Sequence, residues 1–553
     1  MRQNTTTRWG VLAAVVVLAG CSAAEPVTPP SSPTPTEAPP SFEVTVTGEP
    51  EMVFDWSTDA CEPENIPDIA ANAYRDADGN AQLTIGHYVT YRMIGPELDD
   101  VTIDCSAPQL LSSYDDDPSQ FNDSEWIGST YTPDGRTVYA IVHNEYRGDT
   151  HGSARPDQCP SGQRLPCLDT SFTLAVSEDG GTTFNDAAAA PDHLIATLPY
   201  EYRDDTVPSG IRQPSNIIEG PDGFFYLFGN VSDQPDEKQW ICAMRTEDLA
   251  DPSSWRYWDG SAFTGVWSNP YLTDTSESDK CAPLAEDQLS GSLNEGIVYD
   301  EKMEKFIMIG VSFHPFFSSP RWGVYYTTST DLVNWSTREL LIELPVGSSV
   351  ADEETEVIYA YPSLLDPSSS SLNFDRSDGE LYLYMSRFNA GSSSLDRDLL
   401  RWPIEVRERE DVGSVEWNFD TDGDTEGWQV DSGLTELVVA DGTLTTTSTG
   451  DDPYFSTGDI RLPAQPGTMT IRMRTTAPLV RSGQIFWVTE ESPEYGEDKT
   501  AGFRVRSGEE FRDITIDLSE NPGWTGTVRG LRIDPVDLAD LGIEIDRVSF
   551  SPN

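Results

Sequence analysis

Basic residues are scarce in this 553-residue chain, and their scarcity excludes several classes of partner. Lysine and arginine together number 35 against 94 aspartates and glutamates, which gives a formal net charge of −59 at pH 7. A chain with this charge repels phosphate backbones and anionic lipid headgroups, so nucleic-acid binding is excluded. The acidic surplus is typical of a protein that must stay soluble outside the cell. Cation binding, or a neutral or cationic substrate, is the functional alternative.

Patterns that would indicate a cofactor or an activated nucleophile are also missing. The sequence has no Cys-x-x-Cys or His-x-x-x-His spacing for zinc, no glycine-rich nucleotide loop and no nucleophile elbow. We therefore expect that no cofactor is required. Long amphipathic helical patterns are nearly absent as well. Short alternating runs rich in Val, Ile, Tyr and Phe, broken by Asp-Gly and Pro-Asp-Gly turns, predict an all-β protein.

The N-terminus has the features of a secretory signal. Arg2 and Arg8 precede an apolar run, Val11 to Leu18, that is too short to cross a bilayer of about 30 Å as a mature helix. The following Leu-Ala-Gly-Cys21 resembles the lipobox of bacterial lipoproteins, in which the cysteine is acylated and becomes the first mature residue. The resemblance implies a signal peptide at 1–20, a palmitate-bearing anchor at Cys21 and a location on the outer face of the bacterial cell membrane. An ordinary secreted protein is the alternative.

The residues after the lipobox predict a tether and a set of disulfides. Residues 21–41 are rich in Pro, Thr and Ser, and such a chain stays extended because it has little to bury. Once Cys21 is assigned to the lipid, six cysteines remain, an even number that implies disulfides in an exported protein. Their order along the chain suggests three pairs, one connectivity of fifteen: Cys61–Cys105, Cys159–Cys167 and Cys242–Cys281.

One structural plan recurs along residues 42–412. Each copy has a polar start, a β run, a turn with Gly, Asp or Asn and a second hydrophobic β run. The copies begin near Ile66, Ser124, Arg212, Leu293 and Tyr361. Four-stranded units of this size, repeated radially, form a β-propeller. We therefore predict five blades, or six if the strands from Phe42 form a further partial unit, and we expect residues 396–412 to lead out of the propeller.

The sequence pattern changes near Ser414, and residues 413–553 are predicted to form a second domain. Alternating strands without a helical segment indicate a β-sandwich of the jelly-roll type. Phe419, Glu426-Gly427-Trp428, the run Arg532 to Pro535 and the run Ile545 to Val548 resemble features of carbohydrate-binding and galactose-binding-like modules. The resemblance covers the whole domain and implies that it binds sugars.

Two turns resemble those of known propeller enzymes. Ser177 to Phe184 matches the sialidase Asp-box, Ser-x-Asp-x-Gly-x-Thr-Trp, with Phe in place of Trp. In this turn the aspartate bonds the backbone and glycine supplies a positive φ. Ser329 to Trp335 resembles the related turn of five-bladed glycosidases of the arabinanase and invertase kind. These turns lie outside the active site in those families, so they predict the fold rather than the catalytic residues.

Three acids near the expected mouth of the propeller are candidates for catalysis. Glycoside cleavage needs two carboxyl groups about 5–9 Å apart, one acting as an acid and one ionised. The resemblance to five-bladed glycosidases implies that the base or nucleophile is an aspartate of the first blade, a position that Asp68 fits. Glu145 and Glu295 compete for the general acid. Asp68, which follows Ile-Pro, also has an ordinary structural interpretation as a turn residue.

Polar residues beside these acids are candidates for substrate binding. Arg212 would grip a carboxylate or sugar hydroxyls, although it would equally pair with one of many acids. His143, Asn294 and Tyr361 complete the set. A sialidase proper would need three converging arginines and a Glu–Tyr pair, and no arginine here stands in such a motif. The sialidase alternative is therefore the weaker one.

The acidic run that opens the second domain suggests a calcium site. Asp420, Asp422 and Asp424 alternate along the chain, and carboxylate oxygens suit a hard cation. The EF-hand pattern fails because Thr425 stands where that loop requires Gly. Structural calcium in the sandwich is therefore one interpretation, and a solvated turn is the other.

Together these features favour a surface lipoprotein that acts on an extracellular polysaccharide or glycoconjugate. Its propeller would be a glycoside hydrolase and its second domain a carbohydrate-binding module. A non-catalytic receptor that only captures glycan or protein is the alternative, because propellers host both functions.

Overall fold

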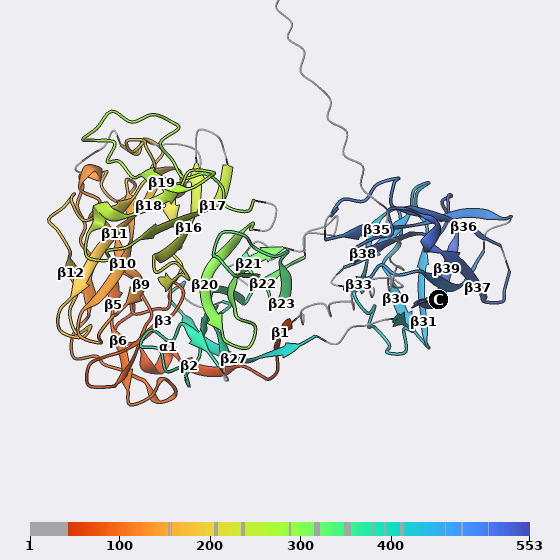
Figure 1. Ribbon diagram of the computed structural model, residues 1–553, viewed down its shortest axis with the longest axis horizontal. Helices are drawn as coiled ribbons and strands as arrows, with labels where there is room; N and C mark the ends of the chain where they lie inside the picture. Colours follow the sequence, from red (N-terminus) through yellow and green to blue (C-terminus); the bar gives the residue numbers. More distant parts are fainter. Residues whose placement is uncertain are drawn as a thin grey trace, which may run out of the picture. The chain divides into compact units, whose positions relative to one another are not determined.

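The computed structural model describes residues 42–552, apart from 153–154, 156–157, 204–207, 234–237, 287–288, 314–320, 348–355, 379–380, 392–393, 410–413, 459, 477–478, 491 and 507. The predicted signal peptide, the lipidated Cys21 and the tether lie outside the described residues. Within the described part, no helix has the length and apolar character needed to span a membrane. The chain is nearly all β, as the sequence predicts (Figure 1).

The strands up to residue 408 form the five blades of a propeller. The first blade contains β3 (Asn72–Arg75), β4 (Ala81–Thr84), β6 (Arg92–Gly95) and β7 (Thr102–Ile103). The second contains β9 (Glu125–Tyr131), β10 (Val138–Arg147), β11 (Leu168–Ser177), β12 (Asn185–Asp186) and β13 (Leu194–Ala196). The third contains β14 (Ser209–Arg212), β15 (Ile218–Glu219), β16 (Phe225–Asp233), β17 (Lys238–Thr246), β18 (Arg256–Trp258) and β19 (Phe263–Val266).

The fourth blade contains β20 (Ser292–Asp300), β21 (Lys305–Phe313), β22 (Trp322–Ser329) and β23 (Glu339–Ile342), with β25 (Arg376–Ser377) beside β20. The fifth contains β24 (Ile358–Leu365), β26 (Leu381–Phe388), β27 (Arg397–Glu408), β1 (Phe42–Val46) and β2 (Glu51–Phe54). A separate ribbon pairs β5 (Val89–Thr90) with β8 (Leu110–Leu111). The short helices are α1 (Trp56–Asp59), η1 (Leu98–Asp100), η2 (Pro118–Gln120), η3 (Leu165–Cys167) and η4 (Pro252–Ser254).

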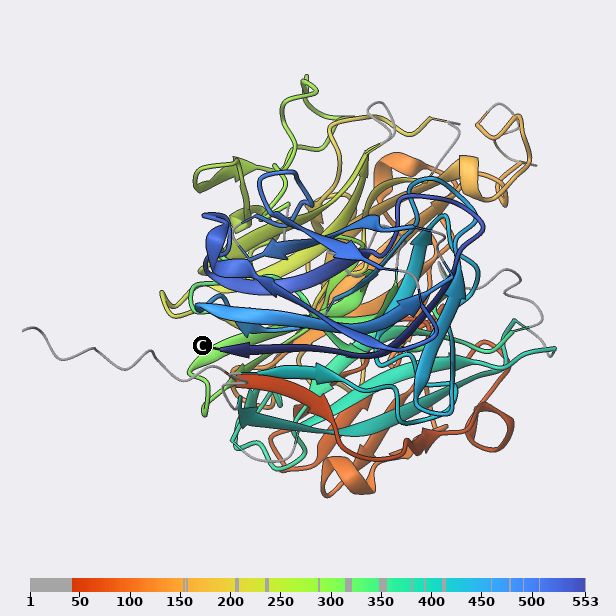
Figure 2. The ribbon, with the colours of Figure 1, turned by 90° about the vertical axis from the view of Figure 1, so that its right-hand side faces the viewer.

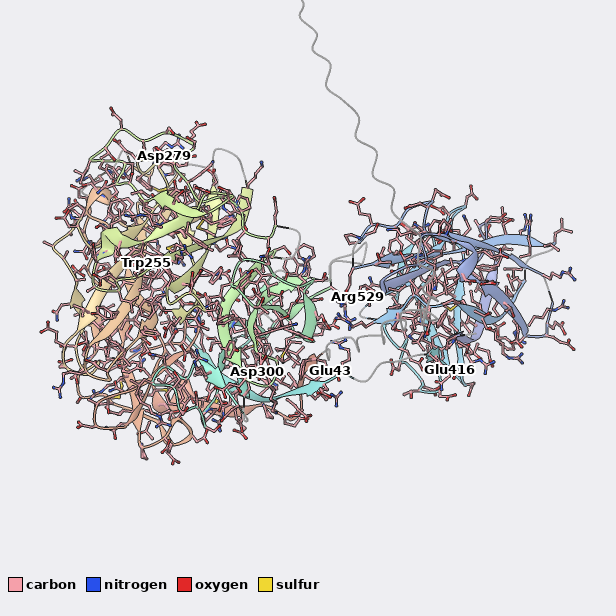
Figure 3. All side chains as sticks on the ribbon, in the orientation of Figure 1. Glu43, Trp255, Asp279, Asp300, Glu416 and Arg529 are labelled. Carbon is pink, nitrogen blue, oxygen red and sulfur yellow. A yellow bond between two sulfur atoms is a disulfide. The ribbon has the colours of Figure 1, made fainter. Side chains whose placement is uncertain are left out.

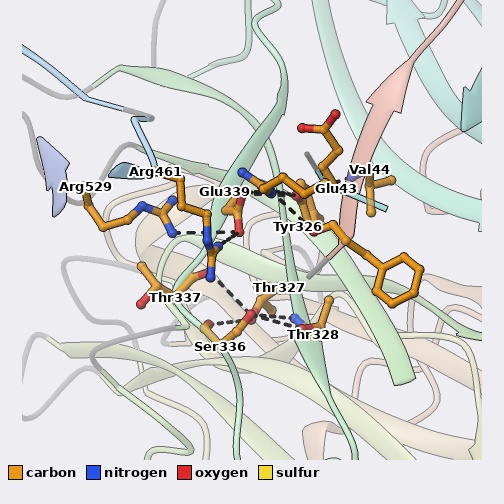
Figure 4. A network of polar contacts seen from close by, with 12 residues as sticks. Glu43, Val44, Tyr326, Thr327, Thr328, Ser336, Thr337, Glu339, Arg461 and Arg529 are labelled. Carbon is orange, nitrogen blue, oxygen red and sulfur yellow. Dashed lines mark hydrogen bonds and ion pairs between the residues drawn. The ribbon is translucent and has the colours of Figure 1, made fainter. Parts of the chain in front are cut away.

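The N-terminal strands close the ring instead of forming a sixth blade. Both β1 and β2 pair antiparallel with β27 of the fifth blade, and Figures 1 and 2 show the red β1 beside the teal strands. The contact extends to the fourth blade, where the Val44 N–H donates to the Tyr326 hydroxyl at 3.4 Å and Tyr326 donates to Glu339 Oε2 at 3.2 Å (Figure 4). The expectation that 396–412 leads out of the propeller is wrong, because 397–408 is a full strand of the last blade.

Hydrophobic layers between neighbouring blades hold the ring together. Five buried clusters each draw residues from two adjacent blades, as with Tyr74 and Val142 between the first and second. The cluster between the second and third includes Trp255, which is fully buried (Figure 3). Burial of apolar surface stabilises by roughly 25 cal/mol per Å², so these layers are the main source of stability. They leave the starts of the first strands free to carry polar groups.

The described cysteines confirm the predicted pairing. Disulfides join Cys61 to Cys105, Cys159 to Cys167 and Cys242 to Cys281. The two predicted turns also have the expected local bonds. Asp179 Oδ1 accepts from the Thr183 N–H at 2.9 Å, and Asp331 Oδ1 accepts from the Asn334 N–H at 2.7 Å.

The residues from 415 onward form a β-sandwich. One sheet contains β28 (Val415–Trp417), β30 (Val438–Ala440), β31 (Thr443–Thr447), β34 (Gly467–Thr475), β37 (Arg512–Asp517) and β39 (Gly542–Pro552). The other contains β29 (Trp428–Ser432), β32 (Tyr454–Thr457), β33 (Leu462–Pro463), β35 (Arg481–Thr489), β36 (Thr500–Val505) and β38 (Thr527–Asp534), and η6 (Leu518–Glu520) follows β37. One apolar cluster, with Trp487 at its centre, fills the space between the sheets.

Candidate active site

Asp68 lies just before β3 and is surrounded by three polar side chains. Its Oδ1 accepts a hydrogen bond from the Tyr361 hydroxyl at 3.1 Å and forms an ion pair with Arg397. Its Oδ2 lies 3.5 Å from His87 Nε2. Arg397 is itself fixed, because its guanidinium stacks over the Phe388 ring at 4.1 Å. The carboxylate is therefore held in one orientation by groups from the first and last blades.

Tyr361 reaches Asp68 from a strained backbone. Its φ is +57°, in the left-handed region that bulky side chains rarely adopt. The residue sits in β24 where the pairing with β26 shifts between Ala360 and Ser363, so its side chain leaves the regular ladder. Such strain costs of order 1–3 kcal/mol and persists only where the surroundings fix it, often at functional sites.

Glu295 lies in a similar irregularity of the fourth blade. The pairing of β20 with β21 shifts between Ser292 and Gly296, and Glu295 is only 3% exposed. Burial raises the pKa of Glu295 to about 8, although the Val311 N–H donates to Oε2 at 3.2 Å and acts in the opposite direction. This carboxyl is thus protonated near neutral pH.

The same glutamate borders a central cavity to which every blade contributes. The cavity, of about 10 Å³, has room for about one water molecule. Its polar lining includes Asn72, Thr130, Asn216, Glu295 and Ser363. Glu295 therefore lies where the five inner strands converge.

Tyr361 connects Asp68 with Glu295. Burial raises the pKa of the Tyr361 phenol well above its ordinary value. The negative charge of Asp68 adds to this rise, and so does that of Glu295. The phenol is therefore close enough to both carboxyls to sense their charges. Tyr361 thus bonds the first-blade acid and lies within the electrostatic influence of one of the two glutamates that the sequence leaves in competition.

Glu145, on β10, has a different environment from Glu295. Its Oε1 lies 3.5 Å from His143 Nε2, and its Oε2 lies 3.2 Å from Arg164 Nη2. Burial acts to raise the pKa of Glu145, but the hydrogen bond with His143 and the positive charges of Arg164 and Arg147 oppose it, and the pKa is lowered. Glu145 is accordingly an ionised group and not a proton donor at neutral pH.

Arg212 and Asn294 present polar atoms without partners. Burial lowers the pKa of Arg212, while the charges of Glu145 and Tyr361 act to raise it, which places the guanidinium near both. Its Nε is buried and has no hydrogen-bond partner among the described residues. Asn294 Nδ2 donates to the Gln213 carbonyl at 2.8 Å, whereas its buried Oδ1 lacks a partner within the same residues. Both atoms are buried, and the described residues leave their hydrogen-bonding capacity unused.

Two residues of this site escaped the sequence prediction. His87 and Arg397 both contact Asp68, but neither stands in a repeat start or a recognisable motif. Arg397 also belongs to the segment that we expected to leave the propeller. Only the pairing of β27 with β26 and β1 reveals that it returns to the centre.

The carboxylates predicted to bind calcium do not converge on one point in the structure. Asp422 Oδ1 accepts from the Asp441 N–H at 3.0 Å and Asp424 Oδ1 from the Glu426 N–H at 2.8 Å, so both carboxylates bond the backbone of turns. Among the described residues, the one group of three acids or histidines with ligand atoms close enough for a metal lies elsewhere and excludes Asp420. The interpretation as a solvated turn is the one that the geometry favours.

The sandwich carries a second candidate site on the sheet that contains β38. Phe455, Ile485 and Ile533 point into the core, so the alternate residues of the same strands face the opposite side. That side combines aromatic and charged groups. Arg532 stacks over the Tyr454 ring at 3.5 Å and forms paired contacts of 2.7 Å with Asp534.

Further polar side chains accompany this stacked pair. Gln429 Nε2 is buried without a hydrogen-bond partner in the described residues, and Tyr495 interacts with Ser456 and with the charge of Arg532. A surface with an aromatic ring and a guanidinium fixed by a carboxylate has the chemistry needed to bind a sugar.

No protein-family model matches the sequence, and no curated protein sequence matches it either. Similar solved structures include a glycoside hydrolase family 43 arabinoxylan arabinofuranohydrolase from Bacillus subtilis in complex with cellotetraose (10% identity, 89% of this chain and 97% of that chain, TM-score 0.35). Another is an exo-beta-1,3-galactanase from Phanerochaete chrysosporium with galactose (7% identity, 90% and 100%, TM-score 0.32). A mutant of a carbohydrate binding module family 29 is similar to 25% of this chain, over 90% of its own length (12% identity, TM-score 0.19). At such low identities and TM-scores, the chemistry of the site rests on its own residues.

Proposed function

We propose that the protein is a glycoside hydrolase in which Glu295 is the general acid and Asp68 the base or nucleophile. One contrast carries this proposal: Asp68 is bonded by the Tyr361 phenol and paired with Arg397, whereas Glu295 is buried at the central cavity with its pKa raised to about 8. Two carboxyl groups with opposed environments in one polar centre are what acid–base cleavage of a glycosidic bond requires.

In the reaction, Glu295 gives its proton to the oxygen of the leaving sugar while the anomeric carbon gains positive charge. Asp68 then either removes a proton from an attacking water or attacks that carbon itself. Tyr361 and Arg397 hold the Asp68 oxygen in place, so little reorganisation is needed at the transition state. Because Asp68 has His87 on its other oxygen, a proton taken up there has a nearby acceptor.

Glu145 and Arg212 are assigned to substrate binding. Glu145 is held as an anion by His143 and Arg164, so it suits sugar hydroxyls as an acceptor. The buried Nε of Arg212 is a donor without a partner among the described residues, and its guanidinium interacts with the charge of Glu145. Asn294 adds an acceptor through its free Oδ1.

We assign the Arg532 face of the sandwich to carbohydrate binding and the N-terminal Cys21 to a lipid anchor on the outer face of the bacterial membrane. The tether at 21–41 would then let the propeller and the sandwich reach glycans near the cell. The stacked Arg532 and Tyr454 support the first assignment, and the Leu-Ala-Gly-Cys sequence supports the second.

The test is hydrolysis of a panel of plant, fungal and bacterial glycans by the wild type and three variants. We expect Glu295→Gln and Asp68→Asn to reduce kcat by about 10²–10⁴-fold. Glu301→Gln, an exposed glutamate that directly follows the strand of Glu295, should match the wild type. If the wild type binds a glycan but does not hydrolyse it, the protein is a receptor rather than an enzyme. Full activity of Glu295→Gln would contradict the assignment of the acid.

A further inference from the structure

A second polar cluster lies in the second blade. One oxygen of Glu125, one oxygen of Asp186 and one ring nitrogen of His193 all lie within 4.8 Å of one another. The three come from separate segments: Glu125 starts β9, Asp186 ends β12 and His193 precedes β13. Convergence of an imidazole with two carboxyls from three segments is unexpected unless something holds them together.

The histidine is prepared for a ligand. His193 is completely buried, and its Nε2 lies 3.2 Å from the Phe121 carbonyl oxygen, so this nitrogen is the donor. Its Nδ1 then carries a lone pair, yet it has no hydrogen-bond partner among the described residues. A metal-bound histidine typically donates its other ring N–H to a carbonyl, which fixes the tautomer and the orientation of the ring.

The carboxylate of Glu125 is likewise fixed by hydrogen bonds from neighbouring groups. The Ser113 N–H donates to its Oε2 at 3.1 Å, and the Asn122 amide, with its nitrogen facing the carboxylate, donates at 2.7 Å. In the part of the chain that the structure describes, no lysine or arginine forms an ion pair with Glu125 or Asp186. Two carboxyls therefore meet in the second blade without a cationic side chain to offset them, whereas the nearby Asp123 has His151 at 2.7 Å.

We propose that Glu125, Asp186 and His193 bind a divalent transition-metal ion, Zn²⁺ in the first place. Imidazole nitrogen and carboxylate oxygen are ligands of Zn²⁺, which takes three protein ligands with a water in the fourth position. Ca²⁺ takes six to eight oxygens and is disfavoured by the histidine. The ion supplies the positive charge that the cluster lacks.

The ion would brace the inner strand of the blade against its outer edge. Glu125 follows Asp123 and Ser124, whose carbonyl oxygens accept from the Glu145 N–H at 3.2 and 3.1 Å. A metal that fixes Glu125 thereby fixes the backbone that positions Glu145. This role is independent of whether the propeller cleaves glycans, so it is tested by binding and stability.

The experiment uses the full chain carrying Cys21→Ser, so that no free thiol is present, after treatment with EDTA. Zn²⁺ is titrated by calorimetry in excess Ca²⁺ and Mg²⁺, which suppress binding by exposed acids. We expect one Zn²⁺ per chain and a rise in Tm. Asp186→Asn should weaken Zn²⁺ binding at least tenfold and abolish the rise in Tm, because it removes one of the three ligands. Asp186 is exposed, so we expect this variant to fold as the wild type does.

Glu178→Gln, an exposed glutamate of the same blade, is the matched control and should bind as the wild type does. His193→Gln, checked for folding by circular dichroism, should also lose the site. Equal Zn²⁺ affinity in Asp186→Asn and the wild type would overturn the proposal. Absence of binding by the wild type, or full displacement of Zn²⁺ by Ca²⁺, would overturn it too.

Discussion

Tyr361 holds Asp68 across the junction of the first and last blades, with 3.1 Å between the phenol oxygen and Oδ1. The tyrosine makes this bond from a left-handed backbone, and the aspartate has a second bond to Arg397. Because β1 and β2 complete the last blade, this pair also depends on closure of the ring. The carboxylate that we propose as the base or nucleophile is thus oriented by residues of the last blade, which is complete only when the ring is closed.

Tyr361→Phe removes this bond and keeps the ring. A hydrogen bond to a charged group contributes about 1.5–3 kcal/mol, so we expect kcat to fall by about ten- to a hundredfold with little change in Tm. Tyr359→Phe, on the same strand and outside the site, should leave activity unchanged. Equal kcat for Tyr361→Phe and the wild type would show that the phenol does not orient Asp68.

The raised pKa of Glu295 predicts the alkaline limb of the activity profile. As the acid it must be protonated, so kcat should fall as the pH rises through about 8. Glu295→Gln should lose this limb together with most of its activity. If the kcat of Glu295→Gln still falls as the pH rises through about 8, another group must be responsible for the alkaline limb.

The same shift predicts a pH-dependent difference in stability. A carboxyl whose pKa is higher in the folded state than in the unfolded state contributes stability that is complete below the unfolded pKa, about 4.3, and is lost as the pH rises through about 8. Relative to Glu295→Gln, the wild type should therefore lose a few kcal/mol between these values. Chemical unfolding of both proteins across this range measures the difference, and a constant difference would contradict the shift.

Local signals in the sequence predicted much of this structure. The repeat starts placed Asp68, Glu295 and Tyr361 at or near the inner strands of their blades, and cysteine order sufficed because each disulfide joins cysteines that are consecutive in the chain. His87 and Arg397 were missed because their place depends on strand pairing between distant segments. Of the two interpretations of the run from Asp420 to Asp424, the structure favours the solvated turn, because the carboxylates of Asp422 and Asp424 accept from backbone N–H groups.

Loss of a disulfide should destabilise the protein according to the loop that it closes. Cys61–Cys105 spans 44 residues and Cys159–Cys167 spans 8. The chain-entropy estimate gives about 4 kcal/mol for the first and about 2.5 kcal/mol for the second. Paired Cys→Ser variants unfolded in guanidinium chloride measure the two values. If loss of Cys159–Cys167 lowers the free energy of unfolding more than loss of Cys61–Cys105, contacts in the native state determine the stabilisation rather than the entropy of the unfolded chain.

Arg532 predicts that glycan capture by the sandwich is separable from catalysis. Its guanidinium lies over Tyr454 and is fixed by Asp534, so Arg532→Ala removes both the stacked surface and the donors that a sugar would use. We expect at least about tenfold weaker binding to insoluble polysaccharide, with unchanged kcat on short soluble substrates. Arg472→Ala, on the other sheet of the sandwich, is the control, because it also pairs with aspartates but lies on β34. If Arg472→Ala weakens binding and Arg532→Ala does not, the sugar-binding face belongs to the sheet that contains β34.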